Sequence, residues 1–189
     1  MGSGEEENTV RKVVLYELMA LDGVAEEPGD WMLDVADDVF DNLAAVISSQ
    51  TDVLLGRGTF DYWAGYWPTS DVEPFAGFIN AVPKHVVTST PLTLPWSGAQ
   101  AVTERVEDHV ARLKAGPGGD IGVHGSITLA QSLLQAGLVD ELRLVIVPTV
   151  AHGGRRLFPE GPRCRRLDLV SVRPSSTGSL FVHYAARST

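Results

Sequence analysis

Residues 120–150 read DIGVHGSITLAQSLLQAGLVDELRLVIVPTV and decide the fold of this chain. A short apolar run predicts a strand, and a glycine-bearing turn leads from it into a helix from about Ser126 to Ala136. Gly137 is typical of the residue that follows a helix, and a second apolar run covers residues 141–150. A strand, a helix and a strand in this order form a crossover unit, which joins two parallel strands.

The turn within this stretch is suited to holding phosphate. Gly122 and Gly125 let the backbone approach a ligand with no Cβ in the way. Ser126 and Thr128 lie where the helix begins, among N–H groups without intrahelical partners and at the positive end of the helix dipole. The sequence therefore indicates a nucleotide cofactor.

The pattern on both sides of this unit continues the alternation of strands and helices. Further strands are expected over residues 13–21, 52–56, 85–89 and 100–103, with helices over residues 34–48, 74–82 and 104–114. Alternating residues over 167–172 and 180–184 predict a terminal antiparallel hairpin. We therefore expect an α/β fold, with one mixed, mostly parallel sheet covered by helices on both faces. Residues 11–187 would form a single domain behind a loose N-terminal tail, residues 1–10.

The composition of the chain argues against several classes of partner and site. The 189-residue chain has a formal net charge of -9, which argues against a surface for nucleic acid or anionic lipid. The single cysteine, Cys164, and the five scattered histidines predict neither an intrachain disulfide nor a metal site. With no membrane-length apolar run and no signal-peptide pattern, we expect a cytoplasmic protein whose partner is a small molecule.

Four strand ends carry the residues that suggest a site, because ligands of such sheets bind at the carboxyl ends of the strands. They are residues 21–23, 56–59, 88–90 and 124–126. In this order they resemble the dihydrofolate reductase-like superfamily, most closely the branch typified by the reductase domain of riboflavin biosynthesis. The motifs that carry the resemblance are MALDG at 19–23, LLGRGTF at 54–60, GDIGVHGS at 119–126, LVDEL at 138–142 and GGRRLF at 153–158.

The resemblance covers nearly everything from Arg11 to Arg187. It implies an eight-stranded sheet with a C-terminal hairpin, NADPH as hydride donor, a substrate cleft near the end of the first strand, and a homodimer. The cofactor-binding residues carried over from it are Gly56, Arg57, Thr59, Thr88, Ser89, His124, Gly125, Ser126, Ile127 and Thr128. Ser126 stands where many dihydrofolate reductases have arginine, and no arginine follows Thr88-Ser89, so NADH or a flavin is the alternative cofactor.

The expected chemistry depends on fewer residues. Asp22 falls at the loop that lies on the nicotinamide side of the site in this family. Asp37 lies near the place where dihydrofolate reductases keep the carboxylate that binds the pterin, and Trp31 lies near the place of their cleft tryptophan. Asp22 and Asp37 are thus the catalytic candidates, although turn chemistry and the helix dipole also account for them. Trp31, Phe60 and Trp63 are the candidates for stacking on a flat substrate, with core packing or a dimer contact as the alternative for Phe60 and Trp63.

The function expected from these residues is an NAD(P)H-dependent reductase. It would pass hydride to a small, flat heteroaromatic ring, such as a pterin or an aminopyrimidine. The alternatives are a catalytically inactive nucleotide- or flavin-binding module of the same fold and a homodimeric scaffold.

Overall fold

One eight-stranded sheet organises the molecule. The computed structural model describes residues 10–159 and 164–187, so residues 1–9 of the predicted tail lie outside the described residues. The strand order is β4-β3-β2-β5-β1-β6-β8-β7. The strands are β1 (Val13–Ala20), β2 (Gln50–Gly56), β3 (Lys84–Val87), β4 (Ala99–Val102), β5 (Asp120–Val123), β6 (Glu141–Val147), β7 (Leu167–Pro174) and β8 (Leu180–Ala186).

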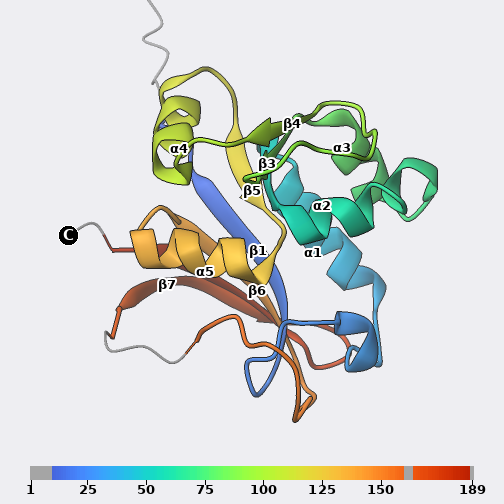
Figure 1. Ribbon diagram of the computed structural model, residues 1–189. Coiled ribbons are helices and arrows are strands. Elements are labelled where there is room, and N and C mark those ends of the chain that lie inside the picture. Colours follow the sequence, from blue (N-terminus) through green and yellow to red (C-terminus); the bar gives the residue numbers. More distant parts are fainter. Residues whose placement is uncertain (1–9, 160–163, 188–189) are drawn as a thin grey trace, which may run out of the picture.

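The pairing within this sheet is mixed. The strands from β4 to β6 pair in parallel, whereas β8 is antiparallel to both β6 and β7. The hairpin of β7 and β8 closes one end of the sheet (Figure 1). The predicted mixed, mostly parallel eight-stranded sheet with a C-terminal antiparallel hairpin is thus confirmed.

Helices cover both faces, as predicted. The α-helices are α1 (Asp37–Ile47), α2 (Arg57–Trp63), α3 (Phe75–Ala81), α4 (Val106–Ala115) and α5 (Ile127–Ala136), and two short 3-10 helices span Pro28–Asp30 and Trp67–Thr69. No helix in the described ranges is long and apolar enough to cross a membrane.

The alternation of side chains along β1 shows which helices share a face. Val14 and Tyr16 pack in one cluster with Val39 of α1. Leu15 points the opposite way and packs with Leu129 of α5. Successive strand residues face opposite sides of a sheet, so α1 and α5 lie on opposite faces. Figure 1 shows the same separation, with α4 and α5 on one side of the sheet.

Element boundaries differ from the sequence prediction at several ends. Strand β6 stops at Val147 because Pro148 has no N–H to continue the ladder. Helix α1 begins at Asp37, three residues later than expected, after an extended Ala36. Helix α5 matches its prediction at both ends: the Ser126 hydroxyl accepts a hydrogen bond from a main-chain N–H of the first turn, and Gly137 follows in the left-handed conformation.

Candidate functional site

Two strand-to-helix corners touch at the carboxyl edge of the sheet. We call residues 56–59 the α2 corner and residues 124–128 the α5 corner. The Gly56 N–H donates to the Gly125 carbonyl oxygen at 3.1 Å. A Cβ on Gly56 would lie 2.1 Å from Ser126 Oγ, and one on Gly125, whose φ is +125°, would lie 3.0 Å from Thr59 Oγ1. Only glycine fits at these two positions, so the corners meet main chain to main chain.

The α5 corner offers unpaired donors for an anion. Ile127 and Thr128 open the helix, so their N–H groups have no intrahelical acceptor. Ile127 is partly exposed and Thr128 is exposed, which leaves these groups within reach of a ligand. Arg155 adds a full positive charge, because its Nη2 donates to Thr128 Oγ1 at 2.8 Å. Helix dipole, free N–H groups and guanidinium all favour a phosphate here.

The prediction missed Arg155 as a site residue. It lies in the connection between β6 and β7, and long-range folding brings it to the α5 corner. The signal was present in the GGRRLF motif at 153–158, which carries two adjacent arginines after two glycines. Sequence alone gives no reason to pair this motif with a helix that begins at Ile127.

Arg57 of the α2 corner reaches the loop after β3. Its Nε lies 2.8 Å from both carboxylate oxygens of Asp61, and its Nη1 donates to Thr90 Oγ1 at 2.7 Å. Thr88 and Ser89 belong to the same loop. No arginine follows Thr88-Ser89 in the sequence, but the fold places the guanidinium of Arg57 beside this strand end.

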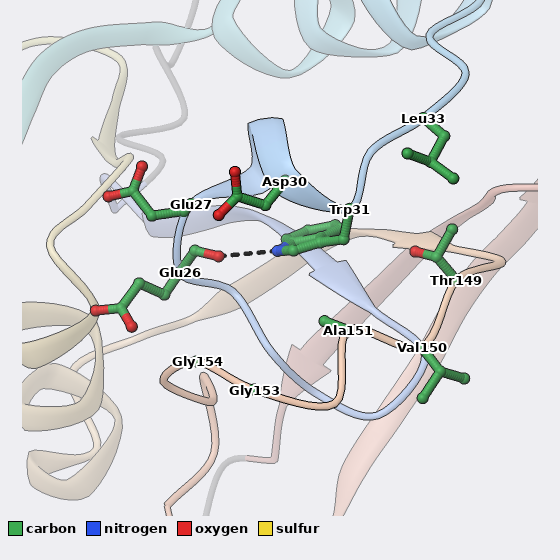
Figure 2. A pocket seen from close by; sticks show the side chains of 10 residues that line it. All are labelled: Glu26, Glu27, Asp30, Trp31, Leu33, Thr149, Val150, Ala151, Gly153 and Gly154. Carbon is green, nitrogen blue, oxygen red and sulfur yellow. Dashed lines mark hydrogen bonds between the residues drawn. The ribbon is translucent and has the colours of Figure 1, made fainter.

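A cavity of about 360 Å³ lies beside the ends of β1 and β6 (Figure 2). Trp31 forms one wall, buried to 5% exposure, and its Nε1 donates to the Glu26 carbonyl oxygen at 2.8 Å. Within the described residues, the buried Thr149 hydroxyl has no hydrogen-bond partner. In Figure 2 the carboxylates of Glu26, Glu27 and Asp30 lie on one side of the indole, and Leu33, Thr149 and Val150 lie on the other. The lining residues are Glu26, Glu27, Asp30, Trp31, Leu33, Thr149, Val150, Ala151, Gly153 and Gly154.

Asp22 holds the wall of this cavity. Its carboxylate accepts hydrogen bonds from the main-chain N–H groups of Ala151 at 3.3 Å and His152 at 3.0 Å. Burial opposes the shift, but these donors, together with the charge of Arg156, hold the pKa of Asp22 below its ordinary value. An ionised carboxylate whose oxygens accept from the backbone fixes the loop, and it is poorly suited to deliver a proton.

Of the two acids that open α1, Asp37 is the more exposed and does not line the cavity. Asp38 is the one that contacts the rest of the fold: its Oδ2 accepts a hydrogen bond from the Ser176 N–H at 2.6 Å. Its other oxygen is buried and has no partner within the described residues. The structure therefore separates Asp37, a predicted catalytic residue, from the cavity.

The predicted substrate contact by Phe60 is wrong. Its ring is fully buried and packs against Trp96, within the core between the sheet and helices α2 and α3. Trp63 is partly buried beside the same core, and its ring meets those of Trp67 and Phe75 edge-on, at centroid distances of 5.9 and 5.4 Å. Neither side chain lines the cavity. Both follow the core-packing alternative, because α2 turns them inward.

His124 also points into the core. Its Nε2 lies 2.8 Å from Gln50 Oε1, and its ring packs beside Tyr16, Phe75 and Phe78. Burial lowers the pKa of His124 to about 3, so the imidazole is neutral. Its side chain is therefore not available to a cofactor phosphate, and only its main chain belongs to the α5 corner.

Comparisons with known proteins agree with this fold. The family model of the RibD C-terminal domain matches residues 11–181. The chain is 28% identical over 181 residues to the uncharacterized protein YyaP of Bacillus subtilis strain 168, covering 92% of this chain and 94% of YyaP.

Solved structures show the same architecture at lower identity. A putative riboflavin biosynthesis protein from Shewanella sp. PV-4 superposes with a TM-score of 0.77 at 19% identity, covering 94% of this chain and 99% of that one. Dihydrofolate reductase from Enterococcus faecalis, solved with NADP(H), gives a TM-score of 0.64 at 16% identity, covering 94% and 97%. The resemblance expected from the sequence is confirmed for family and fold.

Proposed function

Because the chain belongs to the RibD C-terminal domain family, we propose that it is an NADPH-dependent reductase of a small, flat, pyrimidine- or pterin-like ring. The observation that carries this proposal is the contact between the two corners, Gly56 N–H to Gly125 carbonyl at 3.1 Å, with the Arg155 guanidinium on Thr128 of the α5 corner. This arrangement offers main-chain donors and a cation at the carboxyl edge of the sheet, where a dinucleotide diphosphate is best stabilised.

Two parts of the edge would hold the diphosphate and the adenosine half of the cofactor. The N–H groups of Ile127 and Thr128, with Arg155, would bind the diphosphate. Thr88 and Ser89 would face the adenosine ribose. The hydrogen bonds of Arg57 within the described residues use Nε and Nη1, so its Nη2 remains for a 2′-phosphate, which favours NADPH over NADH. When bound, the nicotinamide supplies the hydride.

The cavity beside Trp31 suits an amino-bearing ring. The indole offers an apolar wall, and the unpaired Thr149 hydroxyl offers a hydrogen bond. Carboxylates on Glu26, Glu27 and Asp30 would repel a substrate phosphate and attract amino groups. The loop from Val24 to Trp31 would keep water from the reacting atoms. An aminopyrimidine or a pterin without phosphate fits these requirements.

Nucleotide binding is the first test. NADPH and NADH would be titrated while tryptophan fluorescence is recorded, and loss of reduced-nicotinamide absorbance would then be followed with aminopyrimidines and pterins. Arg155→Gln should weaken binding of both nucleotides about tenfold, as expected for one charge-assisted hydrogen bond. Arg187→Gln, which changes an exposed arginine paired with Asp168, is the control.

The outcomes separate the candidate functions. Failure of the wild-type protein to bind either nucleotide at millimolar concentration would exclude the proposed function. Tight binding without turnover of any ring substrate, or flavin that stays with the purified protein, would instead support the binding module.

A further inference from the structure

Glu17 occupies an unusual place on β1. Strand β5 pairs with β1 only as far as Val123, which lies opposite Leu15. Glu17 is the next residue of β1 on the same face, and it has no strand partner on the β5 side. By the same register it lies level with Gly125, the residue at which the α5 corner meets the α2 corner. Its carboxyl group is therefore placed at the inner end of the proposed cofactor site.

The surroundings of Glu17 are apolar. On β6 it pairs with Leu144, and both neighbours on its own face of β1, Leu15 and Met19, are core residues. The helix packed on this face contributes Leu129 and Leu133. A carboxyl group among these side chains is costly to ionise.

The charged side chains near Glu17 either have other bonding partners or lie on the opposite face of the sheet. Arg143 flanks Leu144 on β6, so its side chain faces the opposite side of the sheet. Arg155 donates to Thr128, and the aliphatic part of Arg156 lies against Gly23. Tyr184 of β8 packs against the same cluster, and Asp52 of β2, two residues before Leu54 of this cluster, is paired with Arg11 and His85. Asp22 and Glu26 accept hydrogen bonds from the main chain of residues 151–155. No ion pair among the described residues includes Glu17.

Burial is the main influence on this group. It raises the pKa of Glu17 to about 8, against a smaller opposing effect of the Leu18 N–H. The residue is nevertheless partly exposed, and neither of its carboxyl oxygens is among the fully buried, unpartnered side-chain atoms of the described residues. At neutral pH the ligand-free protein therefore holds a protonated acid at the edge of the sheet.

We propose that Glu17 acts as a neutral carboxylic acid that donates a hydrogen bond to the bound nicotinamide cofactor, and that the cofactor binds only when this proton is present. The inference rests on the proposed function. A carboxylate level with the α5 corner would repel the diphosphate bound there, whereas a carboxylic acid carries an O–H that a carbonyl oxygen, such as that of the nicotinamide carboxamide, can accept. Glu17 is thus a binding and positioning residue.

The test is the pH dependence of NADPH affinity between about pH 7 and pH 9.5. Burial lowers the pKa of Lys84 on β3 to about 8, so this group also titrates in the range, and the Glu17→Gln variant, which keeps Lys84, separates the two effects. For the wild-type protein, Kd should rise by up to about tenfold per pH unit above about pH 8, since only the protonated form binds. Glu17→Gln keeps a neutral hydrogen-bond donor. It should therefore bind NADPH as tightly as the wild type does at pH 7, and its Kd should not rise with pH. Glu107→Gln, an exposed carboxyl change on α4, should behave as the wild type does.

A second measurement needs no variant. If binding requires the proton, the wild-type protein should take up nearly one proton per NADPH bound at about pH 9, and far less at pH 7. Calorimetric enthalpies in two buffers with different heats of ionisation give this number directly.

The results distinguish the inference from the proposed function. Suppose that NADPH binds, but its Kd for Glu17→Gln rises with pH as steeply as for the wild type, or the wild type takes up no proton on binding. Glu17 then does not have this role, and the reductase proposal stands. If neither nucleotide binds the wild-type protein, the proposed function fails, and the role of Glu17 fails with it.

Discussion

Gly56 and Gly125, residues of different strand ends, are joined by a main-chain hydrogen bond of 3.1 Å. The bond fixes the α2 corner against the α5 corner and leaves room for no side chain between them. The free N–H groups at the start of α5 are therefore held in place by neighbouring backbone, a preorganised arrangement that lowers the entropic cost of binding an anion.

Gly56→Ala should disrupt both stability and nucleotide binding. The new Cβ would lie 2.1 Å from Ser126 Oγ, 2.9 Å from Ser126 Cβ and 3.1 Å from the Ser126 main-chain N, so rotation of the hydroxyl does not relieve the contact and the corners must move apart. We expect a loss of about 1–3 kcal/mol in the free energy of unfolding and at least a tenfold rise in the Kd for NADPH.

The matched control for this change is Gly58→Ala. Gly58 lies within α2, and nothing lies within 4 Å of its Cβ position. Alanine should stabilise the helix there by about 0.5–1 kcal/mol. Urea unfolding and fluorescence titration measure both effects. Equal behaviour of the two variants would show that the contact between the corners is unimportant.

Much of the fold follows from the sequence because its signals are local. Apolar spacing, glycines and prolines marked the strands and helices, and the order of the elements predicted the sheet. The cap at Ser126 and the end at Gly137 were predictable because a helix end needs only its own neighbours. Predicted boundaries differed mainly where one residue interrupts a pattern, as Pro148 ends β6.

The candidate site was harder to predict because it depends on side-chain direction and distant contacts. Both Phe60 and His124 stand in motifs at the carboxyl edge, yet their rings turn into the core. Arg155 reaches Thr128 from a different connection, and burial of Glu17 depends on three elements at once. A motif gives the position of the backbone at a strand end, whereas these features come from tertiary packing.

Arg57→Gln should change the choice of cofactor. The guanidinium lies at the loop that begins with Thr88 and Ser89, where it would meet the phosphate that distinguishes NADPH from NADH. Loss of this charge should weaken NADPH binding by about 10- to 100-fold and NADH binding by only about twofold. Parallel titrations with both nucleotides measure the ratio. Arg105→Gln removes an exposed arginine elsewhere and should leave this ratio unchanged. If Arg57→Gln instead lowers the affinity for both nucleotides equally, Arg57 contacts the diphosphate.

Trp31→Phe should weaken substrate binding and remove the quenching of tryptophan fluorescence that substrate binding causes. The indole Nε1 donates a hydrogen bond to the Glu26 carbonyl oxygen at 2.8 Å. Loss of this bond should weaken substrate binding by about 1 kcal/mol and raise KM several-fold. The other three tryptophans do not line the cavity, and substrate should not quench their emission. Trp63→Phe is the control, and quenching that persists in Trp31→Phe but not in the control would relocate the substrate site.

The outer hairpin strand predicts self-association. Strand β7 is the terminal strand of the sheet, and Leu169, Val170 and Val172 on it are 57%, 54% and 49% exposed. Apolar side chains on an edge strand favour pairing with another chain, so we expect the homodimer implied by the resemblance to form here. Val170→Lys should shift sedimentation toward the monomer, whereas Val150→Lys, an equally apolar change beside the cavity, should not. A wild-type monomer at high concentration would exclude this interface.

Acid should destabilise the protein in part through Asp52. Its carboxylate pairs with the guanidinium of Arg11 and accepts from His85 Nε2 at 2.9 Å. Burial would raise its pKa, but these hydrogen bonds and the Arg11 charge outweigh burial and lower the pKa of Asp52. A depressed folded-state pKa contributes stability above the unfolded value of about 4, and this contribution is lost as pH falls through the folded value.

Asp52→Asn should therefore be less stable than the wild type at pH 7, by about 3 kcal/mol, because it leaves a buried guanidinium without its partner. Between about pH 5 and pH 2 the difference should shrink, since protonation removes the same charge from the wild type. Asp168→Asn breaks a pair whose side chains are 52% and 54% exposed, and it should cost less than about 1 kcal/mol. Denaturant unfolding across this range measures both variants, and a pH-independent difference for Asp52→Asn would mean that packing, not charge, holds Arg11 in place.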